Sequence, residues 1–160
     1  MNLRLQLPSP ADTDALGAAL ARALPSQPVV AYLRGDLGAG KSSLARALLR
    51  ELGVVGAIRS PTYTLVERYP LVEGDAAHLD LYRIAAPGEL EFLALDELRE
   101  ARLWLVEWPE RGGSALPPAD LEIGLSVQDG GRLAELRETS EKGRGWLAAF
   151  SKIAGPSASV

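Results

Sequence analysis

The chain has 160 residues, a length that favours one domain with a single hydrophobic core. Its 47% apolar and 24% charged residues are typical of a soluble globular protein, and the lack of cysteine excludes disulfides and thiolate metal sites. The formal net charge of −4, without a dense basic run, argues against a protein that holds nucleic acid alone, because phosphate neutralisation needs clustered lysine and arginine.

The sequence carries no sign of a membrane segment. Its apolar runs stay well short of the ~18 residues that a membrane-spanning helix needs. The first residues, MNLRLQ, alternate between apolar and polar and lack the long apolar run of a signal peptide. We therefore expect a cytoplasmic protein without a membrane partner.

The first third of the chain alternates predicted strands with predicted helices. Residues 3–7 fit an edge strand, and Ser9 begins a helix whose apolar residues recur at helical spacing. Residues 29–33, VVAYL, form a short apolar run that is typical of a buried parallel strand. Residues 41–52 carry a second helical pattern, which Gly53 ends.

The rest of the chain adds strands, two hairpin signals and a terminal helix. We see no internal repeat or domain linker, and expect a single domain over residues 1–154 with a flexible C-terminal tail over 155–160. The remaining predicted elements are strands at 64–69 and 76–82 around Gly74-Asp75, a mostly helical segment at 89–102, a buried strand at 103–106, a loop at 112–118, strands at 121–127 and 133–138 around Asp129-Gly130-Gly131, and a helix at 141–153.

The strongest functional signal is a phosphate-binding loop. Residues 35–42, GDLGAGKS, match G-x-x-x-x-G-K-[ST] without a mismatch, between a predicted buried strand and an amphipathic helix. Glycines let backbone N–H groups turn inward around phosphate oxygens, and the positive end of the following helix faces the same phosphates. Lys41 can reach the β- and γ-phosphates, and the Ser42 hydroxyl can ligate Mg²⁺.

These features predict a site for ATP and Mg²⁺. An incidental glycine-rich turn is the competing interpretation, and the strand and helix around the loop argue against it. Trp108 follows a predicted strand end and is expected to border the nucleotide. The predicted ATP-binding residues are Gly38, Ala39, Gly40, Lys41, Ser42, Ser43 and Trp108.

A P-loop enzyme also needs an acid near the magnesium ion, usually at the end of a buried strand. Glu107 directly follows the apolar run 103–106 and would emerge beside the P-loop. Asp80 ends the second strand of the first hairpin, where its position alone leaves a surface role equally open. We predict that Lys41, Asp80 and Glu107 are catalytic.

Between the P-loop helix and the first hairpin lies a candidate switch segment. It consists of Ser60, Pro61, Thr62, Tyr63 and Thr64, in a place where nucleotide switches often put a threonine hydroxyl that senses the γ-phosphate. From residue types alone, a plain turn before a strand is the simpler interpretation. The only histidine, His78, cannot form a triad or a metal cluster by itself, so we expect a structural or supporting role for it.

Four motifs, in this order, resemble the TsaE (YjeE-type) family of ATPases, which serve threonylcarbamoyladenosine synthesis in bacterial tRNA. The resemblance implies a three-layer α/β P-loop NTPase fold, with parallel core strands flanked by antiparallel strands. The motifs span about the first two-thirds of the chain: residues 35–42 (GDLGAGKS), 60–67 (SPTYTLVE), 78–83 (HLDLYR) and 106–110 (VEWPE).

The resemblance also implies a function. A family member binds the TsaD–TsaB complex and hydrolyses ATP to support threonylcarbamoyl transfer to the adenosine beside the anticodon, so tRNA is met only through the complex. Carried over, Ser42 and Glu107 hold Mg²⁺, Asp80 serves the metal or the attacking water, and residues 60–64 match a switch-like segment. The family usually has threonine where this chain has Ser42, and either hydroxyl can ligate Mg²⁺.

No motif marks the residues that contact adenine, and we expect them in the turn over residues 7–13. No motif marks an arginine finger either. We therefore expect a low intrinsic hydrolysis rate that a partner stimulates. Arg83 is a candidate to act in cis.

The residues disfavour one other function and leave two open. A GTPase is disfavoured, because Asn2 is the only asparagine and an Asn-Lys-x-Asp-like guanine reader is therefore missing. A small-molecule P-loop kinase stays open as the alternative: Arg99, Arg102 and Arg111 could serve it, although no lid-like insertion is visible. A nucleotide-gated binding module, with hydrolysis incidental, also stays open.

Overall fold

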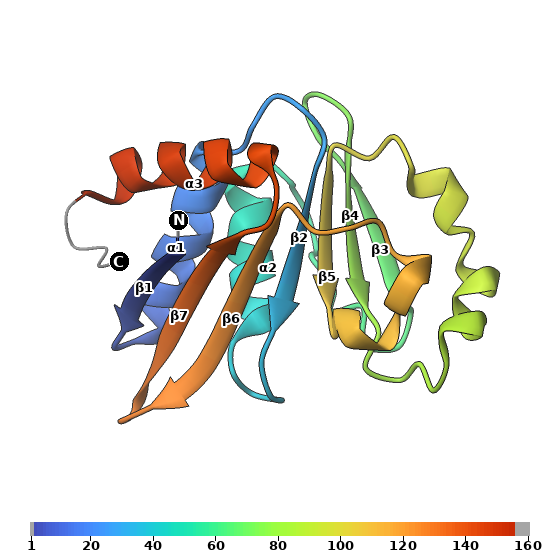
Figure 1. Ribbon diagram of the computed structural model, residues 1–160, viewed down its shortest axis with the longest axis horizontal. Coiled ribbons are helices and arrows are strands. Elements are labelled where there is room, and N and C mark those ends of the chain that lie inside the picture. The colour runs from blue at the N-terminus through green and yellow to red at the C-terminus, as the bar shows by residue number, and fades with distance from the viewer. Residues whose placement is uncertain (1, 156–160) are drawn as a thin grey trace.

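The computed structural model describes residues 2–155, so nearly all of the expected tail at 155–160 lies outside the described residues. Within them, one seven-stranded sheet has the strand order β1-β7-β6-β2-β5-β4-β3 (Figure 1). The strands are Asn2–Leu7 (β1), Val29–Arg34 (β2), Val66–Pro70 (β3), Asp75–Asp80 (β4), Leu103–Glu107 (β5), Leu121–Gln128 (β6) and Gly131–Glu138 (β7), and the helices are Pro10–Arg22 (α1), Lys41–Glu51 (α2) and Glu141–Ala154 (α3).

The centre of the sheet is parallel and its margins are antiparallel. Strands β6, β2, β5 and β4 run in the same direction as neighbours. Strand β3 pairs antiparallel with β4, and β7 pairs antiparallel with both β6 and β1. Strand β1 lies at the edge, as predicted. The expected parallel core with antiparallel flanks is confirmed.

Alternation along the core strands divides the hydrophobic interior between two faces. On β5, Leu103 and Leu105 belong to the core under α1 and α2, whereas Trp104 and Val106 belong to a second core under short 3-10 segments. In Figure 1, α1 and α2 lie behind the sheet, the 3-10 segments lie to the right, and α3 crosses the top of the β6–β7 half. These layers confirm the three-layer fold.

Helix α2 sits close to α1 because of one glycine. A Cβ atom at Gly17 of α1 would lie only 2.8 Å from the carbonyl oxygen of Leu44 and 2.9 Å from the Cβ atom of Ala47. Any larger side chain there would push α2 outward. The close approach therefore fixes where the amino end of α2 stands relative to the sheet.

The segment 89–102, predicted to be mostly helical, is different in the structure. Two 3-10 segments cover most of it, Pro87–Leu93 (η1), which begins two residues earlier, and Leu95–Leu98 (η2). Ala94 lies between them at a left-handed φ of 51°. The left-handed residue stops helix propagation and turns the chain, so that Leu90 and Leu98 both reach the second core. Tertiary packing has overridden the local helical pattern.

Within residues 2–155, no helix is long and apolar enough to cross a bilayer.

Candidate nucleotide site

The loop between β2 and α2 has the backbone that the glycine-rich motif predicts. Gly38 and Gly40 have φ values of 81° and 107°, in the left-handed region that side chains disfavour. Gly40 is also the residue that precedes the first turn of α2, which begins at Lys41. The free N–H groups at the start of this helix therefore face the space above the loop.

Strand register brings the two predicted acids together. Asp80 and Glu107 are partners on the neighbouring parallel strands β4 and β5, and Leu33 on β2 is the other partner of Glu107. Both carboxylates therefore lie at the carboxyl end of the sheet, beside the loop that follows β2. Asp80 is 5% exposed and Glu107 is 2% exposed, so neither is a solvated surface acid.

The loop and the acids enclose a space of about 280 Å³, here called the inner cavity. The Ser42 hydroxyl donates to the Glu107 carboxylate, with Oγ 3.1 Å from Oε1 and 3.2 Å from Oε2. The cavity is lined by Leu37, Gly38, Gly40, Lys41, Ser42, Ser43, Thr62, Asp80, Tyr82, Glu107 and Trp108.

Lys41 is buried and lies between the loop and an aromatic ring. Its ammonium group donates to the carbonyl oxygens of Gly35 and Asp36, the second at 3.0 Å, and lies 4.6 Å from the centroid of the Trp108 ring. Burial lowers the pKa of Lys41, and the nearby carboxylates of Glu107 and Asp80 oppose that shift. A phosphate arriving in the cavity would give this desolvated cation a second anionic partner.

Trp108 adopts an unusual backbone conformation directly after Glu107. Its φ of 56° is left-handed, which costs energy for a bulky residue. The indole ring packs 5.0 Å from the ring of Tyr82, centroid to centroid, and the guanidinium of Arg111 lies 5.9 Å from its centroid. The strained turn therefore places the ring over the inner cavity.

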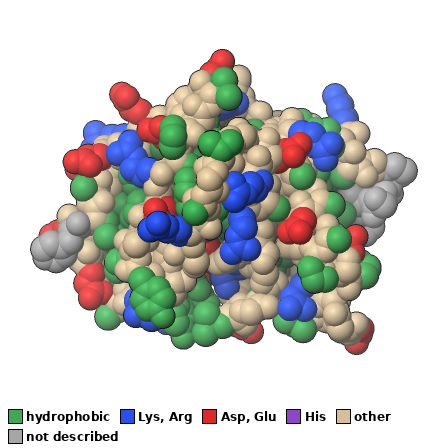
Figure 2. Space-filling model, turned by 180° about the vertical axis from the view of Figure 1, so that it is seen from behind, with side chains coloured by type: hydrophobic (Ala, Val, Ile, Leu, Met, Phe, Trp, Pro, Cys, Tyr) green, Lys and Arg blue, Asp and Glu red, His purple; other side chains and the backbone are tan. Residues whose placement is uncertain are grey.

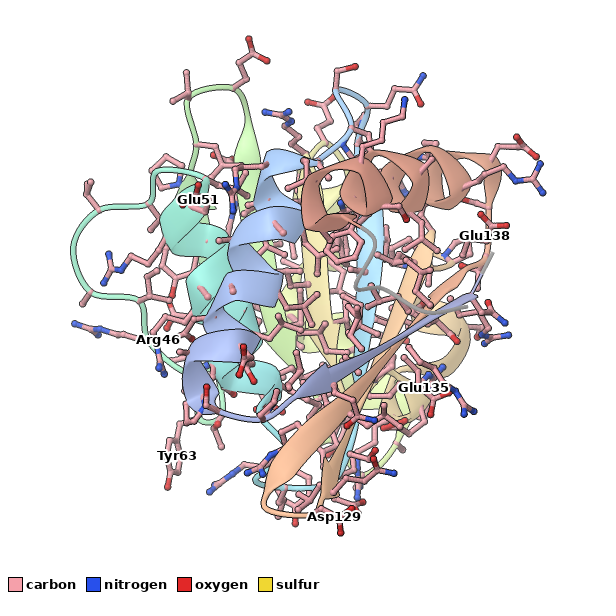
Figure 3. The ribbon with its side chains drawn as sticks, turned by 90° about the vertical axis from the view of Figure 1, so that its left-hand side faces the viewer. Arg46, Glu51, Tyr63, Asp129, Glu135 and Glu138 are labelled. Atoms are coloured by element: carbon pink, nitrogen blue, oxygen red, sulfur yellow. The ribbon has the colours of Figure 1, made fainter. Side chains whose placement is uncertain are left out.

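Part of the candidate switch segment reaches the site. The Thr62 hydroxyl donates to Asp80 Oδ2 at 3.2 Å and pairs with the Ser60 hydroxyl at 2.7 Å. Tyr63 instead is 78% exposed, under the guanidinium of Arg83, and Figure 3 shows it pointing away from the molecule. Thr64 donates to Glu67 at 3.0 Å, outside the cavity.

His78 contacts the site from beneath. It is 1% exposed, and its Nε2 atom lies 2.7 Å from Glu107 Oε2. Strand alternation explains the contact, because His78 lies two residues before Asp80 and therefore on the same face of β4. No group of three or more His, Cys, Asp or Glu side chains in the described residues could hold a metal unaided.

A second and larger space, here called the outer cavity, adjoins the inner one. It has a volume of about 770 Å³ and lies between the β1–α1 turn, α2 and the β6–β7 hairpin. The predicted turn 7–13 supplies five lining residues, and Gly38, Gly40 and Ser43 line both cavities. Its lining residues are Leu7, Pro8, Ser9, Pro10, Thr13, Asp14, Ala18, Gly38, Gly40, Ser43, Arg46, Ala47, Arg50, Glu51, Gly130, Gly131 and Arg132.

Arginines give the outer cavity a basic wall. Arg46 and Arg50 stand one turn apart on the exposed face of α2, and Figure 2 shows Lys and Arg side chains gathered near the middle of this side. Arg46 and the hairpin tip at Asp129 are labelled in Figure 3. Arg132 donates to the carbonyl oxygens of Gly38 at 3.1 Å and Ala39 at 3.2 Å.

Arg132 is the main feature that the sequence did not reveal. Its hydrogen bonds connect the β6–β7 hairpin to the P-loop, although the two segments are more than 90 residues apart in the sequence. A single arginine after a Gly130-Gly131 turn carries no recognisable signal. The contact of His78 with Glu107 could have been foreseen from strand alternation, because both residues face the layer of α2.

A buried strand, a glycine-rich loop and a helix at the centre of a mostly parallel, three-layer sheet define the class of P-loop NTPase folds. The structure of Bacillus subtilis YdiB has this fold too: its crystal structure superposes with a TM-score of 0.81, at 24% sequence identity and 97% coverage of both chains.

Sequence comparison gives the family within that class. The family model described as "Threonylcarbamoyl adenosine biosynthesis protein TsaE" matches residues 7–134, so the chain belongs to the TsaE family, which acts in tRNA threonylcarbamoyladenosine biosynthesis. The match extends beyond the four motifs into strand β7.

Curated relatives carry the same description. The tRNA threonylcarbamoyladenosine biosynthesis protein TsaE of Haemophilus influenzae is 42% identical over 124 residues, which cover 77% of this chain and 78% of that protein. The Aquifex aeolicus protein of the same name is 37% identical over 125 residues, covering 77% of this chain and 86% of its own. The resemblance read from the motifs is confirmed.

Proposed function

We propose that this protein is a Mg²⁺-dependent ATPase that binds the TsaD–TsaB complex and hydrolyses ATP to support threonylcarbamoyl transfer to the tRNA adenosine beside the anticodon. One observation carries the proposal: Lys41, the Ser42–Glu107 pair and Asp80 line a single cavity at a P-loop. A cation, a hydroxyl and two acids at this place are the groups that phosphoryl transfer from ATP requires.

The donor set fits Mg²⁺. This ion prefers oxygen ligands and is usually bound by one or two carboxylates together with substrate phosphates and water. Ser42 and Glu107 offer a hydroxyl and a carboxylate that already lie within 3.2 Å of each other, and would hold the ion with the nucleotide's phosphates. When bound, Mg²⁺ would neutralise charge that develops on the phosphate oxygens.

Lys41 and Asp80 have separate tasks in this scheme. Lys41 exchanges its contacts with the loop carbonyls for the β- and γ-phosphates, and the loop N–H groups bind the same oxygens. Asp80 accepts from Thr62 through Oδ2 and from the Tyr82 N–H through Oδ1, so its carboxylate is held in one orientation. It is thereby suited to position the attacking water and accept its proton.

The outer cavity is the proposed place for the adenosine. Gly38 and Gly40 line both cavities, so the outer cavity adjoins the place proposed for the phosphates. The expected turn 7–13 forms one of its walls. A volume of about 770 Å³ is ample for a base and a ribose. Trp108, on the other side of the phosphates, would report nucleotide arrival through its fluorescence.

A partner is proposed to complete the site. The arginines near the motifs already have partners. The guanidinium carbon of Arg83 lies 4.2 Å from the Tyr63 centroid, and that of Arg111 lies 5.4 Å from the Tyr82 centroid. Arg132 donates to the P-loop carbonyl oxygens of Gly38 and Ala39. We therefore expect slow intrinsic hydrolysis, which TsaD–TsaB accelerates by supplying a cation or by pressing residues 60–64 into place.

The same proposal covers the remaining properties of the chain. Residues 1–154 form a single P-loop ATPase domain that works in the cytoplasm, where the tRNA is. Because the net charge of −4 disfavours tRNA binding by this protein alone, we expect the partner complex to bind the tRNA.

Co-purification with TsaD and TsaB, with and without ATP, tests the partner assignment. Retention that depends on nucleotide supports the proposal, and no retention under either condition contradicts it. An acceptor screen addresses the kinase alternative: an ATPase releases the γ-phosphate to water, whereas a kinase transfers it to a metabolite. Arg99 pairs with Asp96 and Arg102 donates to the Pro25 carbonyl, so neither arginine faces the inner cavity.

A further inference from the structure

The buried side chain of His78 contacts the carboxylate of Glu107, the proposed metal ligand. The two side chains are 2% and 3% exposed, and Nε2 lies 2.7 Å from Oε2. Ser42 reaches the same carboxylate from the α2 side, at 3.1 Å and 3.2 Å. Glu107 is therefore held between two donors that come from different elements of the fold.

The partner of the ring identifies which of its nitrogen atoms acts as the donor. The carboxylate can only accept, so the proton between the two groups belongs to Nε2. Nδ1 is buried and has no hydrogen-bond partner among the described residues. The contact with Glu107 therefore needs only the Nε2–H donor of the ring.

A histidine is not needed to fill this position. Two of its neighbours on the same face are apolar: Ala76 lies two residues earlier on β4, and Leu105 is its register partner on β5. The others are acidic: Glu67 is its register partner on β3, and Asp80 lies two residues later on β4. An aliphatic side chain would continue this core without leaving a polar atom unpaired. The polar contact that His78 gains is the one with Glu107.

We propose that His78 is a positioning residue that orients the Glu107 carboxylate for Mg²⁺, an inference that rests on the proposed function and goes beyond it. The ring N–H fixes one carboxylate oxygen, so the carboxylate plane stays turned toward Ser42 and the phosphate side of the cavity. Outer partners of metal ligands act in this way, and their loss typically weakens metal affinity or activity by ~10- to 100-fold.

Three substitutions of His78 distinguish the effect of its N–H donor from the effect of the volume of its ring. His78→Gln keeps an N–H near the place of Nε2, His78→Asn has too short a side chain to reach it, and His78→Leu fills the space without a donor. The measurement is isothermal titration with a non-hydrolysable ATP analogue at a series of Mg²⁺ concentrations, with thermal unfolding recorded for each variant.

We expect the Mg²⁺ concentration for half-maximal tightening of nucleotide binding to rise by ~10- to 100-fold in His78→Leu and His78→Asn. In His78→Gln it should stay within about threefold of wild type, since the donor is retained. Binding of the analogue without Mg²⁺ should be alike in all of them. If His78→Leu does not fold, the comparison of Gln with Asn carries the test.

A Glu107→Gln background distinguishes positioning from a merely structural role. If His78 acts through Glu107, His78→Leu should cause no further loss of Mg²⁺ dependence in this background. An equal loss in both backgrounds, an unchanged Mg²⁺ dependence in His78→Leu, or a His78→Gln variant as poor as His78→Leu would each overturn the inference. These results would leave the proposed function intact, whereas a wild-type protein without Mg²⁺-dependent nucleotide binding would overturn both.

Discussion

The inner and outer cavities share three residues but are built in different ways. The inner cavity is formed by charged and hydroxyl side chains at two strand ends and at the start of α2, and most of its lining belongs to recognisable motifs. The outer cavity is formed by two turns and by residues of helices α1 and α2, which meet only after folding. The proposed chemistry is thus concentrated in the cavity that local sequence motifs specify, and the proposed adenosine contacts lie in the cavity that tertiary structure specifies.

Lys41→Ala should produce the largest effect, because it removes the only buried cation of the inner cavity. We expect ATP hydrolysis to fall by about a hundredfold or more and ATP binding to weaken sharply, while the fold is retained. Binding is measured by titration calorimetry and the fold by circular dichroism. A folded variant that binds ATP as tightly as wild type would refute the P-loop assignment.

Glu107→Ala and Asp80→Ala should separate hydrolysis from binding. Neither acid is proposed to touch phosphate directly, so we expect hydrolysis to fall by about a hundredfold and nucleotide affinity at saturating Mg²⁺ to change much less. Single-turnover phosphate release gives the first quantity and calorimetry the second. Wild-type rates in both variants would remove these acids from the mechanism. Glu110→Ala, an exposed acid nearby, is the control.

Arg132→Met tests the link between the two cavities. The substitution removes both hydrogen bonds to the loop carbonyls of Gly38 and Ala39, each worth about 1 kcal/mol, so we expect ATP affinity to fall roughly tenfold. Arg137→Met on the same strand, at an exposed position away from the loop, should leave affinity unchanged. Equal affinities in the two variants would mean that the hairpin does not support the P-loop.

Ala18→Phe is expected to have the smallest effect and to act only on the outer cavity. The larger ring would narrow the proposed adenosine space, weakening ATP by a few-fold to about tenfold, whereas inorganic triphosphate should bind as to wild type. Ala15→Phe, exposed on the same helix, is the matched control. If triphosphate binding weakened as much as ATP binding, the adenosine would not lie in the outer cavity.

Much of the inner cavity could be predicted, because its groups belong to the glycine-rich loop, to the start of the helix after it and to the ends of two strands. Glu107 directly follows such a strand, and the carboxyl ends of parallel strands meet at one edge of a sheet. The position of Asp80 left its role open, and strand register decided its place by pairing it with Glu107.

Other parts could not be predicted, because distant contacts determine them. The hydrogen bonds from Arg132 to the P-loop depend on the register of the β6–β7 hairpin. The segment 89–102 has the apolar spacing of a helix, yet a left-handed Ala94 and packing on the second core divide it into 3-10 segments. Within the switch segment, local sequence did not distinguish Thr62, which faces Asp80, from the exposed Tyr63.

The most direct test of the proposed function is steady-state phosphate release at saturating ATP, measured alone and with titrated TsaD–TsaB complex. We predict slow release by the isolated protein and a rate that rises with the partner to saturation, by up to about a thousandfold if the partner supplies an arginine finger. A fast isolated enzyme whose rate ignores the partner would contradict the account.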